Sequence, residues 1–255
     1  MEKTQTKVIV LAGGQGKRMG TEMPKVLVLL NGKPLIRYVC EGIRASGISS
    51  KPIVVIGKGG EAVRDELKNT CEYVRQSEQL GTGHAVMVCE DAVRGTCEHI
   101  IVLYGDMPFV SSREITRLRL THLASRADLT LMTVEVADFS GWKSAFMRYG
   151  RIVRNNAGEI EKIVEYRDAN DKEKNILEVN PSFFCFRASW LWENIHKLKN
   201  INAQKEYYLT DMLGIARKAQ ARIASVSVDP VCAFGVNTKE DLRNAKDLLA
   251  GTTTS

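Results

Sequence analysis

The segment Leu11-Ala12-Gly13-Gly14-Gln15-Gly16-Lys17-Arg18-Met19-Gly20, followed by Pro24-Lys25, comes directly after an apolar, β-branched run at 7–11. That run predicts a buried strand, and the glycines that follow allow the backbone to approach a ligand closely. Successive amide hydrogens of such a loop can bind phosphate oxygens. The segment therefore predicts a phosphate-binding loop at the end of a strand, with Arg18 and Lys25 adding positive charge.

The two commonest phosphate-binding fingerprints fit this loop poorly. The Rossmann pattern requires a third glycine where Met19 stands, and no acidic residue closes a second strand about 20 residues further on. The P-loop pattern requires Ser or Thr after Gly16-Lys17, where the sequence has Arg18. Taken by itself, the loop could also be an ordinary flexible turn between a strand and a helix.

Strand-like and helix-like segments alternate outward from the loop. Apolar runs predict strands at 7–11, 53–56, 71–74 and 99–104, and amphipathic spacing predicts helices at 34–45, 61–67, 83–93 and 112–125. Ser111 and Glu114 predict a capping box for the last of these helices. The alternation predicts a Rossmann-like α/β fold, with a mostly parallel sheet flanked by helices.

The pattern changes after Asp128. Closely spaced β-like runs at 129–136, 148–153, 160–165 and 178–186 predict a small mixed β insertion. Helices return at 189–198, 208–219 and 239–249, with a strand expected at 223–228. Since no linker separates these parts, we expect a single domain over 1–250 and a disordered tail at 251–255.

Composition excludes several classes of protein. The net charge of the 255 residues is +6, but no Lys/Arg block predicts binding to nucleic acid, and anionic small substrates explain the charge equally well. No apolar run approaches the roughly 20 residues that cross a bilayer, and the polar start at 1–7 lacks a signal-peptide core, so we expect a cytoplasmic protein without membrane contact. The six cysteines and four histidines show no metal-like spacing, which favours buried, reduced thiols and structural histidines.

The glycine loop, together with Pro24-Lys25, resembles the signature of sugar-phosphate nucleotidyltransferases, L-A-(A/G)-G-x-G-x-R-M followed by P-K. The resemblance implies the nucleotide-diphospho-sugar transferase fold. It also implies that Arg18 and Lys25 are the catalytic residues, which stabilise the phosphates of a nucleoside triphosphate while a sugar phosphate attacks.

A second segment, Gln76-Ser77-Glu78-Gln79-Leu80-Gly81-Thr82-Gly83-His84-Ala85, resembles the Q-x-x-Q-L-G-T-G-H-A run of bacterial N-acetylglucosamine-1-phosphate uridylyltransferases, the pyrophosphorylase domain of bifunctional acetyltransferases. In that family the glutamine reads uracil, which an amide can do because it offers both a donor and an acceptor. The nucleotide-binding residues implied by the resemblance are Leu11, Ala12, Gly13, Gly14, Gln76, Gly81 and Thr82. Alternatively, the segment is a polar loop that caps the following helix.

Further matches imply a metal site and a sugar site. Asp106 follows the apolar run 102–104 after Gly105, and Gly235-Val236-Asn237 matches the family's G-V-N motif. The resemblance implies that Asp106 and Asn237 are the ligands of Mg²⁺. The implied sugar-binding residues are Tyr104, Gly105, Gly150, Glu165 and Asn180. A run at 202–211 also matches the family near the sugar pocket. The alternatives are ordinary structural roles, with Asn237 as the cap of the last helix.

Two features depart from the family. After Asn180 the family usually has Thr-Gly, whereas this sequence has Pro181-Ser182 beside the implied sugar site. N-acetylglucosamine 1-phosphate is therefore the leading acceptor, and a related hexosamine or hexose phosphate stays open. The C-terminal β-helix of the bifunctional relatives has no counterpart in this sequence, so we expect neither acetyl transfer nor a trimer built through that β-helix. The sequence leaves the oligomeric state open.

The resemblance thus implies transfer of UMP from UTP to a sugar 1-phosphate, with release of pyrophosphate. One alternative is another triphosphate or another sugar, because guanylyl-, thymidylyl- and cytidylyltransferases share the glycine loop. A second alternative is a non-catalytic protein that binds a nucleotide sugar. That reading predicts loss of Arg18, Lys25, Asp106 or Asn237, and the sequence retains all four.

Overall fold

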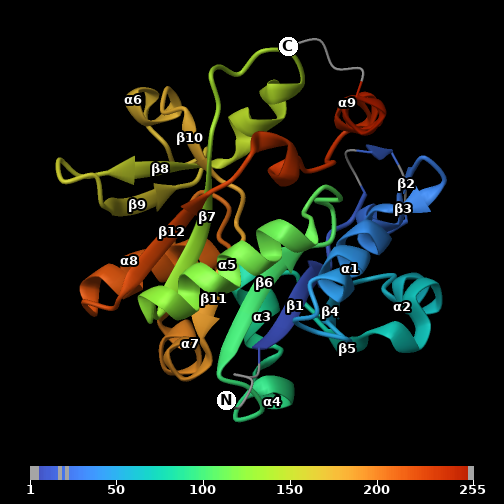
Figure 1. The fold of residues 1–255 in the computed structure, drawn as a ribbon, viewed down its shortest axis with the longest axis horizontal. Coiled ribbons are helices and arrows are strands. Elements are labelled where there is room, and N and C mark those ends of the chain that lie inside the picture. The colour runs from blue at the N-terminus through green and yellow to red at the C-terminus, as the bar shows by residue number, and fades with distance from the viewer. Residues whose placement is uncertain (1–5, 17–18, 21–22, 252–255) are drawn as a thin grey trace.

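A ten-stranded mixed sheet forms the centre of the molecule (Figure 1). The computed structural model describes residues 6–16, 19–20 and 23–251. The first half of the chain supplies four strands, which are β1 (Thr6–Ala12), β4 (Ile53–Ile56), β5 (Glu72–Arg75) and β6 (His99–Tyr104). They lie parallel in the order β5-β4-β1-β6, with Ile9 opposite both Ile53 and Val102. The predicted parallel sheet is confirmed.

The second half of the chain extends this sheet with mainly antiparallel strands. They are β7 (Leu129–Glu135), β8 (Gly150–Arg154), β9 (Ile160–Val164), β10 (Glu178–Asn180), β11 (Phe184–Arg187) and β12 (Ile223–Ser227). The order continues β6-β11-β7-β10-β8-β9, while β12 pairs with β7 in parallel. This is the predicted mixed β region. A small separate hairpin joins β2 (Leu29–Leu30) to β3 (Lys33–Pro34).

Two strand predictions are wrong in detail. The run 178–186 is two strands, because Pro181 lacks an amide hydrogen and Ser182 adopts a left-handed backbone with φ of 62°. As a result β10 joins the β7–β8 ladder and β11 joins the β6–β7 ladder. The strand expected from 148 begins only at Gly150, since Arg148 ends a 3₁₀ helix, Gly141–Arg148.

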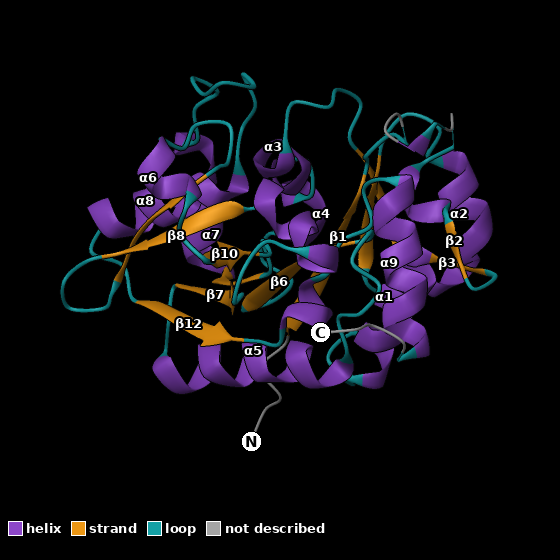
Figure 2. Cartoon of the chain, turned by 90° about the horizontal axis from the view of Figure 1, so that it is seen from above, coloured by secondary structure: helices purple, strands orange, loops and turns teal. Residues whose placement is uncertain are grey.

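Helices cover both faces of the sheet (Figure 2). One face carries α1 (Leu35–Ala45), α2 (Glu61–Leu67), α5 (Ser112–Ser125) and α9 (Lys239–Ala250), and the other carries α3 (Thr82–Met87), α4 (Glu90–Val93), α7 (Ala188–Asn194) and α8 (Met212–Lys218). The short α6 (Asp171–Lys174) lies beside β8. Among the described residues, further 3₁₀ helices are Lys25–Leu27, Lys68–Thr70, Ile195–Lys197, Leu209–Asp211 and Pro230–Ala233.

Two helix predictions need correction. The helix expected at 83–93 is interrupted, because Cys89 N donates to Val86 O in a tightened turn that separates α3 from α4. The predicted capping box of α5 forms only in part. Ser111 Oγ accepts from Arg113 N, but the Glu114 carboxylate contacts the Ser111 hydroxyl rather than its backbone N–H.

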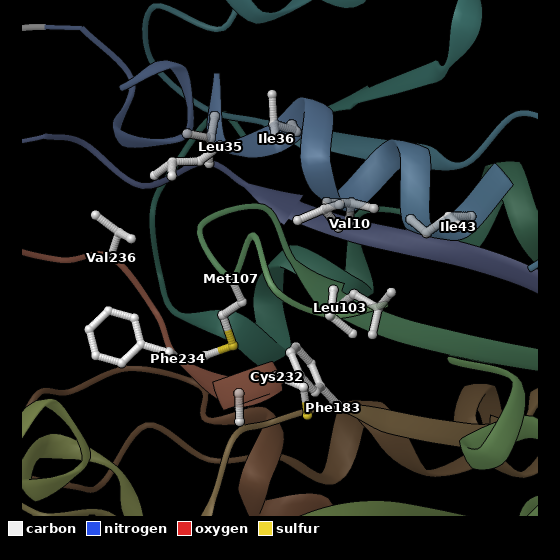
Figure 3. Close-up of a cluster of buried hydrophobic side chains, with 14 of the residues drawn as sticks. Val10, Leu35, Ile36, Ile43, Leu103, Met107, Phe183, Cys232, Phe234 and Val236 are labelled. Carbon is white, nitrogen blue, oxygen red and sulfur yellow. The ribbon is translucent and has the colours of Figure 1, made fainter. Parts of the chain in front are cut away.

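The packing of α1 also anchors the segment that leads to Asn237. The buried residues of α1 recur at helical spacing and cover β1 and β6, where Ile36 lies in the same buried cluster as Val10 and Leu103 (Figure 3). Phe234 and Val236 extend this cluster from the segment before Asn237, and both are fully buried. Burial of each such side chain contributes about 1.5–3 kcal/mol, which holds the segment against the sheet.

Two of the four histidines contact each other in the fold. His122 on α5 is fully buried, and its Nε2 lies 3.1 Å from Nδ1 of His99 on β6. Its Nδ1 lies 2.8 Å from the Thr130 hydroxyl. Burial, together with neighbouring His99, lowers the pKa of His122 to about 4. These two histidines therefore form a neutral, structural pair.

This pair predicts a loss of stability in acid. The unfolded chain binds a proton at His122 near pH 6.5, whereas the folded chain does so only near pH 4. As the pH falls from 6.5 to 4, His122 should therefore remove about 3 kcal/mol of the free energy of unfolding. Urea unfolding at a series of pH values measures this decrease in the free energy of unfolding. The decrease should be smaller in His122→Gln than in wild type, and it should be unchanged in His196→Gln, which replaces an exposed histidine. Equal losses in wild type and His122→Gln would contradict the prediction.

All six cysteines are free thiols, five of them buried, as the sequence predicts. Across the described residues, no helix is long and apolar enough to span a bilayer.

Candidate active site

The carboxyl ends of the parallel strands surround a cavity of about 280 Å³. Its wall contains nine of the predicted site residues together with four that were not predicted. The lining residues are Leu11, Gly13, Gly14, Lys25, Val26, Gln76, Gln79, Gly81, Thr82, Ala85, Tyr104, Asp106 and Glu206. Predicted nucleotide-binding, catalytic, sugar-binding and metal-binding residues from four separate segments thus meet in one place.

The glycine loop passes close to the predicted base-reading residue. A Cβ atom at Gly13 would lie 3.0 Å from Gln76 Oε1, so a side chain there would press on the cavity. The Gln79 side-chain amide donates to Gly13 O, and Lys25 N donates to Gly14 O over 3.2 Å, which ties the loop at both sides. The predicted residue Arg18 lies outside the described residues.

Two predicted residues contribute through the backbone alone. The Ala12 side chain is buried in the hydrophobic core and does not line the cavity. Gly105 N donates to Leu11 O over 3.0 Å, and a Cβ atom at Gly105 would lie 3.0 Å from Val26 Cγ1. Glycine at this position therefore allows the end of β6 to pack closely against the loop.

Gln76 is held in one orientation. It is only 4% exposed, its Nε2 donates to Gly81 O over 3.1 Å, and the same nitrogen lies 3.1 Å from His84 Nδ1. Both of its N–H groups can therefore be occupied by the protein, which leaves the Oε1 acceptor next to Gly13 for a ligand. The segment also precedes α3, as the alternative interpretation expected, and its Gly81 is the N-cap residue, although no side chain caps that helix.

Backbone hydrogen bonds hold the predicted motif at 80–83 against the run 202–211. Gly83 N donates to Tyr207 O over 2.7 Å, and Tyr207 N donates to Leu80 O over 2.8 Å. Gly81 has a φ of 109°, and a Cβ atom there would lie 2.7 Å from Tyr207 O. A glycine is therefore required where these two segments meet.

The Lys25 ammonium joins the two predicted metal ligands. It forms an ion pair with Asp106 at the end of β6, and it donates to Asn237 Oδ1 over 2.7 Å. The Lys25 and Asp106 side chains are only 16% and 8% exposed, so this contact is shielded from water. Residues separated by 212 positions in the sequence thus converge on one cation.

Asn237 is positioned through its backbone rather than acting as a helix cap. Thr238 is the N-cap of α9, and the buried Asp241 carboxylate accepts from the N–H groups of Asn237 and Thr238 over 2.9 and 2.8 Å. Arg148 pairs with the same carboxylate at 2.9 Å. The cap role considered for Asn237 is therefore wrong, and its side-chain oxygen accepts from Lys25 instead.

This arrangement fits a hard divalent cation. A carboxylate oxygen of Asp106 and the amide oxygen of Asn237 already point at one positive group, the Lys25 ammonium. Oxygen donors of this kind suit Mg²⁺, which commonly takes one or two protein ligands together with substrate phosphates. In the part of the chain that the structure describes, no group of three or more His, Cys, Asp or Glu residues could hold a metal ion instead.

A second cavity, of about 220 Å³, adjoins this cluster at Asn237. Its wall consists of Arg148, Tyr149, Glu165, Tyr166, Arg167, Gln204, Tyr208 and Asn237. Of the three predicted sugar residues from the insertion, Glu165 lines this cavity, and Gly150 and Asn180 do not. Gly150 is opposite Asn180 in the β8–β10 ladder, and a Cβ atom at Gly150 would lie 3.4 Å from Glu165 Oε1.

Glu165 is the acidic group of this second cavity. The Thr210 hydroxyl donates to its Oε1 over 2.8 Å. Burial raises the pKa of the Glu165 carboxyl, the Thr210 hydrogen bond opposes that rise, and the nearby Asp211 carboxylate reinforces it. The run 202–211 contacts both cavities, because Glu206 lines the first and Gln204 lines the second.

Some residues of the site were not predicted. Gln79, Val26, Ala85 and Glu206 line the first cavity, although Gln79 and Ala85 belong to the motif that pointed to Gln76. Tyr149, which was not predicted either, lines the second cavity.

Tyr149 holds the segment before Asn237. Its hydroxyl accepts from Gly235 N over 3.0 Å and donates to Ala233 O over 2.9 Å. Burial raises the pKa of Tyr149, so the hydroxyl keeps the proton that it donates.

The fold and this site define a nucleotidyltransferase of the nucleotide-diphospho-sugar transferase fold. The chain belongs to the family of MobA-like NTP transferase domains, whose model matches residues 8–204.

Relatives agree with this assignment. The chain is 36% identical to the bifunctional protein GlmU of Desulfotalea psychrophila over 245 residues, which cover 95% of this chain and 70% of that protein. It is 39% identical to GlmU of Heliobacterium modesticaldum, where the match covers 94% of this chain but about half, 51%, of the relative. A solved Bacillus anthracis structure, described as a glucose-1-phosphate thymidylyltransferase in complex with sucrose, shares the fold with a TM-score of 0.77 at 20% identity, covering 98% and 97% of the two chains.

Proposed function

We propose that this protein transfers UMP from UTP to a sugar 1-phosphate, with N-acetylglucosamine 1-phosphate as the leading acceptor, Mg²⁺ as cofactor and pyrophosphate as the second product. One observation carries the proposal. The cluster of Lys25, Asp106 and Asn237 lies where the two cavities meet, since Lys25 and Asp106 line the first and Asn237 lines the second. A triphosphate in the first cavity and a sugar phosphate in the second would bring their phosphates together at this cluster.

The orientation of Gln76 supports uracil as the base. With both N–H groups directed at Gly81 O and His84, the group left for a ligand is the Oε1 acceptor. The N3 position of uracil carries a hydrogen, which Oε1 can accept, whereas the N3 of cytosine is itself an acceptor. This geometry favours UTP over CTP.

The reaction needs positioning and charge rather than a protein nucleophile or base. An oxygen of the sugar phosphate is already anionic, so it can attack the α-phosphorus of UTP while the bond from that phosphorus to the bridging oxygen of pyrophosphate breaks. The amides of Gly13 and Gly14 and the Lys25 ammonium would hold the phosphates. Bound Mg²⁺ would supply further positive charge, and Asp106 and Asn237 are the residues that would hold it.

The second cavity supports a sugar as the acceptor. Glu165 lines this cavity directly after β9, and Gly150, which pairs with Asn180 in the β8–β10 ladder, lies so close that a Cβ atom there would meet Ile163 Cγ2 at 2.9 Å and Glu165 Oε1 at 3.4 Å. Hydroxyl and acylamino groups of a hexosamine offer both the donors and the acceptors that these side chains need. The GlmU relatives make N-acetylglucosamine 1-phosphate the first acceptor to test.

The test is a pyrophosphate-release assay of the full chain with Mg²⁺, each of four nucleoside triphosphates and a panel of sugar 1-phosphates. We expect the highest kcat/KM with UTP and N-acetylglucosamine 1-phosphate. A different preferred sugar would retain the mechanism and replace the acceptor. No release with any pair of substrates would overturn the proposal.

A further inference from the structure

The turn between β10 and β11 holds a serine in a backbone conformation that favours glycine. Ser182 has a φ of 62°, in the left-handed region, and it directly follows Pro181. A residue with a side chain in this region costs roughly 1–2 kcal/mol, and glycine avoids that cost. Retention of a serine here points to a use for its hydroxyl.

The hydroxyl and the amide of Ser182 both bind the predicted sugar residue Asn180. Ser182 N donates to Asn180 Oδ1 over 3.0 Å, and Asn180 Nδ2 donates to Ser182 Oγ over 3.2 Å. Asn180 is only 2% exposed, so few orientations are open to its carboxamide. The two hydrogen bonds together select one orientation and leave one N–H of Asn180 for a ligand.

Ser182 also touches the wall of the nucleotide cavity. The Ser182 and Thr82 hydroxyls both interact with the hydroxyl of Tyr104, whose pKa is raised chiefly by burial and lowered in part by these two contacts. Tyr104 and Thr82 line the first cavity, whereas Asn180 lies opposite Gly150, which approaches Glu165 in the wall of the second cavity. One serine side chain therefore connects the two halves of the site.

We infer that Ser182 is a specificity-determining residue for the acceptor sugar. It acts by holding the Asn180 carboxamide so that its remaining N–H meets a substituent that accepts a hydrogen bond, such as the carbonyl of an acylamino group. This inference rests on the proposed function.

Two variants separate this role from a structural one. Ser182→Gly removes the hydroxyl and relieves the left-handed backbone, whereas Ser182→Ala removes the hydroxyl and keeps the strain. Both lose one hydrogen bond to Asn180, and a hydrogen bond of this kind is worth about five- to tenfold in affinity. We expect both variants to raise the KM for N-acetylglucosamine 1-phosphate by about that factor, and to lower the preference over glucose 1-phosphate similarly, with the KM for UTP changing less than about twofold.

Melting temperatures provide the discriminating measurement. Ser182→Gly should melt at or above the temperature of wild type and Ser182→Ala should not, yet their acceptor KM values should agree. Acceptor KM values that instead follow the melting temperatures, or that stay at the wild-type value, would overturn the inference while wild type remains active. Absence of activity in wild type with every acceptor would overturn the proposed function, and this inference with it.

Discussion

Replacement of Asp106 by asparagine is expected to lower kcat for pyrophosphate release by about a thousandfold, with little change in the fold. Asparagine has the same shape but lacks the negative charge that pairs with Lys25 and that would hold Mg²⁺. The loss should fall on kcat rather than on the KM for UTP, because the charge matters most while the phosphates react. Steady-state kinetics at saturating Mg²⁺ measure both quantities.

Asp65→Asn on the exposed surface of α2 provides a matched control for the loss of one carboxylate. This variant should retain the kinetics of wild type. The affinity for Mn²⁺ without nucleotide, measured by electron paramagnetic resonance, gives a readout that does not depend on activity, and it should fall in Asp106→Asn alone. Unchanged Mn²⁺ affinity in Asp106→Asn would remove this residue from the metal site.

Much of the site could be predicted from the sequence because its residues lie in short, continuous motifs at strand ends. Gln76 and Asp106 each follow a strand of the parallel half of the sheet, and the carboxyl ends of parallel strands meet at one edge of a sheet. Gly13 belongs to a loop whose composition already indicated close approach to a ligand. The alternation of strands and helices was enough to predict the parallel half of the sheet.

The rest depends on contacts between distant segments, which a linear pattern does not contain. The Arg148–Asp241 ion pair joins residues 93 positions apart, and neither residue belongs to a motif. The run 178–186 reads as one strand by composition, and only the backbone at Pro181 and Ser182 divides it. His99 and His122 are separate in the sequence and meet because α5 packs across the sheet.

Replacement of Lys25 by methionine is expected to have opposite effects on catalysis and on metal binding. Loss of the ammonium should lower kcat by about a thousandfold, since a fixed positive charge beside the reacting phosphates is removed. The same ammonium contacts the side-chain oxygens of Asp106 and Asn237 in the free protein, so its removal should tighten Mn²⁺ binding without nucleotide by about tenfold or more.

Lys172→Met on the exposed surface of α6 is the matched control, and it should change neither kcat nor the affinity for Mn²⁺. Weaker Mn²⁺ binding in Lys25→Met would show that the lysine supports metal binding instead of competing with the metal. Tighter Mn²⁺ binding together with lost turnover would mean that the Lys25 ammonium moves away from the oxygens of Asp106 and Asn237 when metal and nucleotide bind.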